Sequence, residues 1–330
     1  MKKNIFVLAS FVLSLTGCNS SNNKVVIFTA AEDERIAFLK TELDKKFPEY
    51  DIVIQSMSTG AMYSKLSNEK HDTECDIFYD FEVGNAMRLL NGDSNIFADL
   101  SSLDYSIYDE SVFDNGIQNN QFMVNCKTDA AFIVNTKVLQ QKNIAEPTSW
   151  NDLLDSKYKG LIEMSNPKSS GTGYCIYNGL VSLEGMEAAL TYFDSLNVNI
   201  KEFTTSGAAP LQDVVRGDVA VGTGMLWELI QAANSNNDLK VVQLDKGLPY
   251  NLYTMGMVKG HETKKTVNDV YVYLYSELNQ EQCSKFNPDK IYKNQKASQI
   301  ANYPSQTTEI PMKGLYDPSY KQSLLDSWKY

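Results

Sequence analysis

Histidine is scarce in this chain of 330 residues, which contains only His71 and His261. A metal site built from histidines, or a catalytic triad with a histidine between a serine and an aspartate, therefore has almost no residues to draw on. The sequence also contains neither a GxSxG nor an HExxH motif, which mark two large classes of hydrolase. These absences argue against the commonest hydrolytic sites.

Cysteine is also uncommon, and its spacing gives no metal or redox motif. Four cysteines follow Cys18 at wide intervals and form no CxxC pair: Cys75, Cys126, Cys175 and Cys283. Spacing alone cannot assign disulfides among them, and isolated buried thiols are the simpler expectation.

Positive charge is in deficit throughout the chain. There are 41 acidic and 30 basic residues, which give a formal net charge of −11 at pH 7. No segment carries a stripe of lysine and arginine, and an acidic surface disfavours the phosphate backbone of nucleic acids. We therefore expect no nucleic-acid partner.

Long apolar runs are absent except at the N-terminus. Two lysines there precede an apolar run at residues 5–15, which ends in the letters LTGC. Basic residues, a run too short to span a bilayer and small residues after it are typical of an export signal. LTGC also resembles the bacterial lipobox, which implies a signal peptide at residues 1–17, lipidation of Cys18 and a polar tether at residues 18–23. The mature protein is then expected outside the cytoplasmic membrane, anchored to it by lipid.

The remaining sequence alternates between short strand-like runs and amphipathic helices. Residues 24–28 form an apolar run rich in β-branched residues, and Ile36, Leu39 and Leu43 then share one face of a helix expected at 33–47. Strands are expected at residues 24–28, 51–55, 76–79, 129–134, 160–164, 200–204, 219–221, 239–244 and 250–258. Helices between most of these strands predict an α/β fold.

Four loops in this pattern join a hydroxyl residue to a glycine before a helix begins. They are Ser58-Thr59-Gly60, residues 169–173, Ser206-Gly207 and Thr223-Gly224. The free N–H groups of a first helical turn, the helix dipole and the hydroxyls together suit an oxyanion. Because strand ends in open α/β sheets face a common crevice, the loops predict two lobes that close on one small anion. The simpler alternative is that these residues only cap their helices.

The same loops carry a resemblance to a known family. The segments are STG at 58–60, TSWNDLLDSKYKG at 148–160, NPKSSGTGY at 166–174, TTSGAAP at 204–210 and RGDVAVGTG at 216–224. In order and spacing the set resembles the solute-binding proteins of ABC importers with the type II periplasmic-binding fold. The resemblance implies a two-lobed α/β protein, each lobe a mixed sheet flanked by helices, with the ligand in the cleft between the lobes.

The resemblance also implies the division of the chain and its partners. Lobe 1 is expected at residues 24–128 and 259–330, and lobe 2 at residues 129–258, with crossing strands at 129–134 and 250–258. The implied protein is a monomer that binds without catalysis, needs no cofactor or metal, and delivers its solute to an ABC permease in the membrane.

Among such proteins, SSGTG followed by TSG is especially similar to binders of 2-aminoethylphosphonate and phosphate esters. A small phosphoryl-type anion is therefore the expected solute. Ferric binders of this branch usually carry neighbouring tyrosines after the glycine strand, whereas residues 224–230 here read GMLWELI. Ferric iron stays an alternative solute, since phenolate and carboxylate oxygens suit it. An exported phosphate-ester hydrolase and a surface adhesin are alternatives of other classes.

The candidate ligand-binding residues lie at strand ends or in the hydroxyl-rich loops. They are Ala30, Ser58, Thr59, Gly60, Asp80, Ser169, Ser170, Gly171, Thr172, Ser206, Gly207, Thr223 and Tyr253. Asp80 is expected either to cap a helix or to face the crevice and meet a ligand amine, and Glu82 to sit in a first helical turn. Tyr253 and Trp227 could instead belong to the core or the rim.

Overall fold

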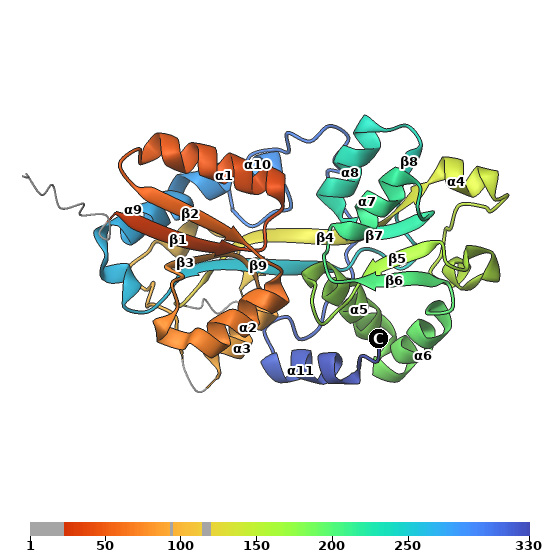
Figure 1. The fold of residues 1–330 in the computed structure, drawn as a ribbon, viewed down its shortest axis with the longest axis horizontal. Coiled ribbons are helices and arrows are strands. Elements are labelled where there is room, and N and C mark those ends of the chain that lie inside the picture. The colour runs from red at the N-terminus through yellow and green to blue at the C-terminus, as the bar shows by residue number, and fades with distance from the viewer. Residues whose placement is uncertain (1–22, 93–94, 114–119) are drawn as a thin grey trace, which may run out of the picture.

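The computed structural model describes residues 23–92, 95–113 and 120–330, so the signal peptide and Cys18 lie outside the described residues. The described chain forms two α/β lobes joined by two crossing strands (Figure 1). No helix within these ranges has the length and apolar character needed to cross a membrane.

Nine strands make up the sheets of the described residues. Their bounds are β1 (Lys24–Thr29), β2 (Asp51–Ser56), β3 (Ile77–Glu82), β4 (Met123–Asn135), β5 (Ile162–Ser165), β6 (Ile200–Thr204), β7 (Val221–Met225), β8 (Leu239–Val242) and β9 (Tyr250–Met257). The strand order is β2-β1-β3-β9-β4-β7-β5-β6, and β8 also pairs with β4. The parallel pairs lie within each lobe, whereas every pair that involves β4 or β9 is antiparallel.

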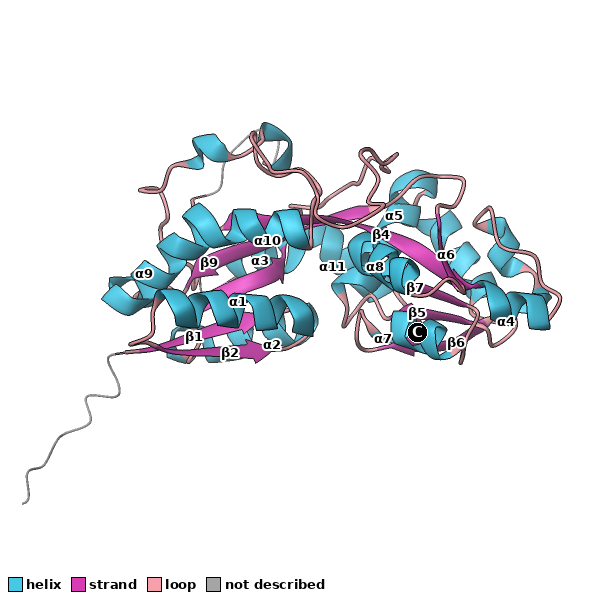
Figure 2. Cartoon of the chain, turned by 90° about the horizontal axis from the view of Figure 1, so that it is seen from above, coloured by secondary structure: helices cyan, strands magenta, loops and turns pink. Residues whose placement is uncertain are grey.

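Helices cover both sides of these sheets (Figure 2). In the described residues they are α1 (Asp33–Lys46), α2 (Thr59–Glu69), α3 (Val83–Leu90), α4 (Thr136–Gln141), α5 (Gly171–Glu184), α6 (Met186–Leu196), α7 (Ala209–Arg216), α8 (Leu226–Ser235), α9 (Lys265–Tyr273), α10 (Asn279–Lys285) and α11 (Pro318–Ser327). A π-helical turn at Leu274–Leu278 joins α9 to α10. Most strands therefore lead into a helix, as the alternating pattern predicted.

The crossing strand β4 is longer than expected from the sequence. It begins at Met123 rather than at residue 129. Residues 123–129 pair with β9, and residues 130–134 pair with β7. A partner more than 100 residues away in sequence thus orders a stretch whose composition resembles a loop. Since one strand pairs with the sheets of both lobes, it connects the two lobes.

Each lobe has its own hydrophobic core, and the C-terminal helix joins the second. The first core is built around β1, β3 and α9, and the second around β4, β7 and α5. Leu324 and Trp328 pack in the second core, where the Trp328 ring contacts Tyr177 and Phe193. Helix α11 also contacts lobe 1, since Lys321 pairs with Glu82 of β3, so it bridges the two lobes (Figure 1). The assignment of residues 259–330 to lobe 1 stays a prediction.

The cysteines of the described chain are free and buried: Cys75, Cys126, Cys175 and Cys283. Burial raises the pKa of each thiol, to about 12 for Cys283. Thiols in such surroundings are poor nucleophiles, so they belong to the packing of the two cores.

Candidate functional site

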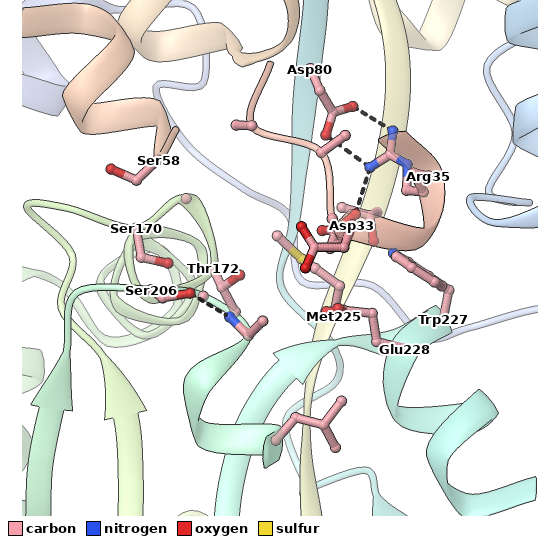
Figure 3. Close-up of a pocket in the computed structure, with 18 of the residues that line it drawn as sticks. Asp33, Arg35, Ser58, Asp80, Ser170, Thr172, Ser206, Met225, Trp227 and Glu228 are labelled. Atoms are coloured by element: carbon pink, nitrogen blue, oxygen red, sulfur yellow. Dashed lines mark hydrogen bonds and ion pairs between the residues drawn. The ribbon is translucent and has the colours of Figure 1, made fainter. Parts of the chain in front are cut away.

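A cleft with a volume of about 790 Å³ lies where the two lobes meet. Its lining comes from the first turns of α1 and α2 in lobe 1, and from the first turns of α5, α7 and α8 in lobe 2 (Figure 3). The crossing strands form its floor through Cys126, Thr128 and Tyr253. Helix N-termini from both lobes thus converge on one space.

Four hydroxyl residues, Ser58, Ser170, Thr172 and Ser206, form what we call the hydroxyl wall (Figure 3). Ser58 caps α2 by accepting a hydrogen bond from the Ala61 N–H at 3.3 Å, and Ser170 caps α5 by accepting from the Gly173 N–H at 3.3 Å. A hydroxyl that accepts such a bond still has its own O–H to donate. The capping role and the anion-binding role of these residues are therefore compatible.

Glycine allows two of these loops to approach closely. A Cβ added at Gly207 would lie 2.8 Å from Thr172 Oγ1 and 3.1 Å from Ser170 Oγ. Both distances are shorter than ordinary van der Waals contact. The SSGTG and TSG segments thus lie against each other, with Gly207 beside the hydroxyls of Ser170 and Thr172.

The lobes also touch across the cleft. A Cβ added at Gly60 of α2 would lie 2.9 Å from the carbonyl oxygen of Lys168 and 3.3 Å from the Cα of Ser169. These atoms belong to opposite lobes, so the two lobes are in direct contact at this point. Gly60 itself is not part of the cleft lining, although it was expected to be a ligand-binding residue.

Opposite the hydroxyl wall lies a set of carboxylates. We call three of them, Glu32, Asp33 and Glu228, the acidic wall. Glu32 and Asp33 begin α1, and Glu228 lies in the first turn of α8. Burial raises the pKa of Glu32, although Arg35 opposes the shift. Burial also raises the pKa of Glu228 well above its usual range, and the charge of Glu32 adds to this shift.

Arg35 is the one basic residue in the described lining of the cleft. Its Nη2 donates to Asp80 Oδ1 at 2.6 Å, and its Nη1 donates to Asp80 Oδ2 at 2.8 Å and to Glu32 Oε2 at 3.0 Å. Asn125 Nδ2 donates to the same Asp80 Oδ1 at 3.0 Å. Bidentate pairs of this kind are strong and directional, so the guanidinium is committed to carboxylates of the protein.

The expected roles of Asp80 need correction. Asp80 does not cap α3: the cap is Glu82, whose carboxylate accepts from the N–H groups of Gly84 and Asn85 at 3.1 and 2.9 Å. Asp80 does line the cleft, but Arg35 occupies the position that was expected for a ligand amine. Its backbone φ of +59° also lies in the left-handed region, which few residues other than glycine adopt and which recurs at functional sites.

Thr223 is the other candidate that the structure places elsewhere. It lies inside β7, is fully buried and does not line the cleft. The expected loop at Thr223-Gly224 is part of the strand, where both residues pair with β4, and the neighbouring helices pack closely on the glycines of this strand. A Cβ at Gly222 would lie 2.8 Å from the carbonyl oxygen of Pro210. These glycines therefore serve helix–strand packing, not a turn.

The remaining candidates line the cleft. They are Ala30, Ser58, Thr59, Asp80, Ser169, Ser170, Gly171, Thr172, Ser206, Gly207 and Tyr253. Thr59 Oγ1 accepts from the Glu82 N–H at 3.1 Å and so also ties α2 to β3. Trp227, which could have belonged to the core or the rim, is buried and also lines the cleft.

Sequence reasoning missed Arg35, Glu32, Asp33 and Glu228 as residues of the cleft. Arg35 and the acids beside it were treated only as part of an amphipathic helix. Glu228 lies in the segment 224–230, which was considered only for its lack of tyrosines. Their position at the start of helices that follow strands was the available signal.

The described residues contain no group of three or more His, Cys, Asp or Glu side chains arranged to hold a metal ion. Tyr253 is the one tyrosine in the described lining, and burial raises the pKa of its hydroxyl well above the usual value. A phenolate ligand for a hard metal ion is therefore unfavourable at this position.

Two α/β lobes, antiparallel crossing strands and a cleft lined by helix N-termini define a type II periplasmic binding protein. Solved structures share this fold. The periplasmic binding protein P5PA aligns with a TM-score of 0.79 at 19% identity, over 93% of this chain and 98% of its own. AfuA from Actinobacillus pleuropneumoniae, solved with fructose-6-phosphate bound, aligns with a TM-score of 0.78 at 22% identity, over 92% and 97%. Iron-bound HitA from Pseudomonas aeruginosa gives 0.73 at 15% identity, over 93% and 99%.

The sequence places the chain in a family. A model of the bacterial extracellular solute-binding proteins matches residues 75–307, and the chain belongs to this family. A protein of Haemophilus influenzae without an assigned function is 24% identical over 263 residues, 75% of this chain and 71% of its own. A Salmonella typhi protein provisionally named a 2-aminoethylphosphonate-binding periplasmic protein is 28% identical over 160 residues, or 46% of each chain.

The family and the fold confirm the expected class: this is a substrate-binding protein of an ABC importer, of an extracellular or periplasmic type. Such proteins deliver small solutes to their permeases, and the family and its neighbours bind without catalysis.

Proposed function

We propose that this protein captures a small phosphoryl-type anion, a phosphonate or a phosphate ester, and delivers it to its permease. The observation that carries the proposal is the convergence of Ser58, Ser170, Thr172 and Ser206 on one side of the cleft. Hydroxyls and N–H groups from several directions suit the acceptor oxygens of a tetrahedral group better than one planar carboxylate.

Two of the similar proteins also support a phosphoryl-type solute. One relative is named for a phosphonate, and one protein of the same fold was solved with a sugar phosphate. We infer 2-aminoethylphosphonate as the first solute to test and a hexose phosphate as the second. The protein acts as a monomer without catalysis or cofactor in this proposal, with lobe 2 closing on lobe 1 about the crossing strands.

Lipid anchoring belongs to the same proposal. Cys18 carries the lipid that holds the mature chain outside the cytoplasmic membrane, and residues 18–23 form the tether. If so, the Cys18→Ser protein is released or left uncleaved in cell fractionation. A Cys18→Ser protein that is processed normally and stays fully in the membrane would contradict the anchor and leave the solute untouched.

Ferric iron is the second candidate solute, because carboxylates line one side of the cleft and HitA shares the fold. The raised pKa of Tyr253 and the commitment of Asp80 to Arg35 weigh against it. Hydrolysis of phosphate esters is a weaker candidate function still, since no nucleophile paired with a base lines the described cleft.

Isothermal titration calorimetry of the purified mature chain tests the proposed solute. The titrants are 2-aminoethylphosphonate, ethylphosphonate, a hexose phosphate and ferric citrate. We expect at least one phosphoryl-type ligand to bind and to raise the melting temperature, with about 2.7 kcal/mol of added stability at a hundredfold excess over its Kd. Binding of ferric ion alone would replace the proposed solute class with iron.

A further inference from the structure

The C-terminal end of helix α11 and the residues after it are attached to lobe 2. The hydroxyls of Tyr177 in α5 and Ser327 in α11 are hydrogen-bonded at 2.7 Å. Lys168 Nζ, from the loop before α5, donates to the carbonyl oxygen of Trp328 at 2.9 Å. Since the Trp328 ring also packs in the second core, this end of the helix is held by side chains of lobe 2.

The middle of the same helix is attached to lobe 1. Lys321 Nζ lies 2.8 Å from Glu82 Oε2 at the end of β3, and the two side chains are 3% and 0% exposed. At the next position, Gln322 Oε1 accepts from Arg88 Nη2 of α3 at 2.7 Å. Figure 1 shows α11 lying between α3 and α6 along the lower side of the molecule. Helix α11 is therefore a connection between the lobes in addition to β4 and β9.

Lys321 also lies between the two helices whose starts carry the hydroxyl wall. Its Nζ is 3.3 Å from the centre of the Tyr174 ring, near the start of α5. Its partner Glu82 donates a backbone N–H to the Oγ1 of Thr59, the first residue of α2. A cation that meets a ring face on one side and a carboxylate on the other is held from two directions. One ammonium thus contacts the supports of α2 in lobe 1 and of α5 in lobe 2.

The burial of this ion pair makes its energy depend on the contact between the lobes. A buried carboxylate or ammonium without its partner is strongly unfavourable. If Lys321 were removed, the charge of Glu82 would stay buried between β3 and α11, and movement of the lobes apart would let water reach it. Loss of either charge therefore favours an open cleft, whereas loss of both leaves no buried charge to hydrate.

We propose that Lys321 is a positioning residue that holds the two lobes together through its ion pair with Glu82, which we call the interlobe pair. The pair sets how closely the starts of α2 and α5 approach each other, and so how the hydroxyl wall is assembled. It acts without touching the solute, because neither side chain is part of the described cleft lining. The inference therefore does not depend on which solute binds.

The distance between two spin labels in the unliganded protein, measured by pulsed electron paramagnetic resonance, tests the proposal. The labels are attached at Ala37→Cys on α1 and Val215→Cys on α7, two exposed positions on opposite lobes. The cysteines of the described chain are buried and do not compete for the label, and Cys18 is replaced by serine. Lys321→Met and Glu82→Gln should each shift the distances to longer values.

The affinity for 2-aminoethylphosphonate, measured by calorimetry, is the second readout. Apparent affinity falls with the fraction of molecules that can close, so each single variant should bind about tenfold more weakly, as for the loss of one hydrogen bond to a charged group. The double variant Lys321→Met/Glu82→Gln should recover towards the wild type in both distance and affinity. A role in packing alone predicts the opposite, because a second substitution would then add to the damage.

Lys329→Met, in the same labelled protein, is the matched control. Lys329 pairs with Asp194 of α6 near the same end of the chain, but both side chains are exposed and the pair lies within lobe 2. The variant loses the same charge without removing a contact between the lobes. Its label distances and its affinity should therefore equal those of the wild type.

Several outcomes would overturn the interlobe pair as a positioning device. Wild-type distances in folded Lys321→Met and Glu82→Gln proteins would do so, as would a double variant that is as open as the single ones. Near-ultraviolet circular dichroism shows which variants are folded, and if Lys321→Met is not, Glu82→Gln and the double variant decide. If 2-aminoethylphosphonate fails to bind the wild type, the proposed solute fails, whereas the label distances still decide the role of Lys321.

Discussion

At the scale of single residues, Ser170 combines a structural and a binding role. Its Oγ accepts from the Gly173 N–H, and its side chain lines the cleft next to Thr172. The loss of a hydrogen bond to a charged ligand group costs about 1.5–3 kcal/mol. Ser170→Ala should therefore weaken ligand binding by about tenfold to a hundredfold, measured by calorimetry.

Asp317→Ala separates this effect from the loss of a helix cap. Asp317 caps α11 by accepting from the N–H groups of Ser319 and Tyr320 at 2.9 and 3.0 Å, outside the cleft. Both variants should lose about 1 kcal/mol of stability, as capping variants do, but only Ser170→Ala should lose affinity. Wild-type affinity in Ser170→Ala would assign this serine to helix capping alone.

Local chemistry made the hydroxyl residues predictable, whereas pairing over long distances did not. Ser58 and Ser170 directly precede the helices that they cap, and Ser206 lies shortly before α7, so their positions can be read from neighbouring residues. The partner of Asp80 is Arg35, 45 positions away, and no local pattern connects them. The pairing of Asp80 with Arg35 could not be predicted for that reason.

At the scale of elements, helix α11 forms a buried ion pair with lobe 1. Lys321 Nζ lies 2.8 Å from Glu82 Oε2, and both side chains are at most 3% exposed. Removal of one partner leaves the other charge buried and unpaired, at a cost of about 3–5 kcal/mol. Lys321→Ala should lower the unfolding free energy by that amount in urea denaturation.

An exposed ion pair near the chain end provides the comparison. Lys329 Nζ lies 2.8 Å from Asp194 Oδ2, with side chains 55% and 46% exposed. Exposed pairs contribute about 0–1 kcal/mol, so Lys329→Ala should change stability little. Equal losses in the two variants would show that the Lys321–Glu82 pair has no special weight.

The crossing strand β4 contains an acid that should make stability depend on pH. Asp129 is fully buried, and its N–H donates to Asp289 Oδ2 at 3.2 Å. Burial, then the neighbouring Asp289, raise the pKa of Asp129 to about 8, and burial raises the pKa of Asp289 to about 6. Both pKa values lie above those of an unfolded chain.

The direction of the effect follows from the raised values. The folded state holds these protons more tightly than the unfolded state, so the stabilisation is complete below about pH 4 and is lost as the pH rises through 6 and then 8. Asp129→Asn cannot titrate, so its unfolding free energy should fall less between pH 5 and pH 9. Denaturation curves with the same pH dependence in both proteins would contradict the raised pKa values.

The elements themselves were predicted well where their pattern is local. The helix expected at residues 33–47 and the strand at 24–28 match α1 and β1 to within a residue. The start of β4 and the inclusion of Thr223 in β7 were missed because distant partners decide them. β9 pairs with the first half of β4, and the second half of β4 pairs with Thr223 and its neighbours in β7.

At the scale of the whole molecule, the contact at Gly60 decides whether the lobes can close. A side chain at this position would meet the backbone of Lys168 and Ser169 in lobe 2 at 2.9–3.3 Å. Backbone atoms in a packed loop cannot move aside as a flexible side chain can. Two-lobed closure follows from the fold class, but this point of contact could not be predicted from sequence because it joins two loops from different lobes.

Gly60→Val should therefore hold the lobes apart. In small-angle scattering, the wild type at saturating ligand should become more compact than its unliganded form, as hinge closure predicts, whereas Gly60→Val should keep the larger radius and bind more weakly. Ala61→Val is the control, because Ala61 is exposed one residue further along α2 and gains a similar volume without facing lobe 2. If Gly60→Val compacts as fully as Ala61→Val on ligand addition, the Gly60 contact does not limit closure.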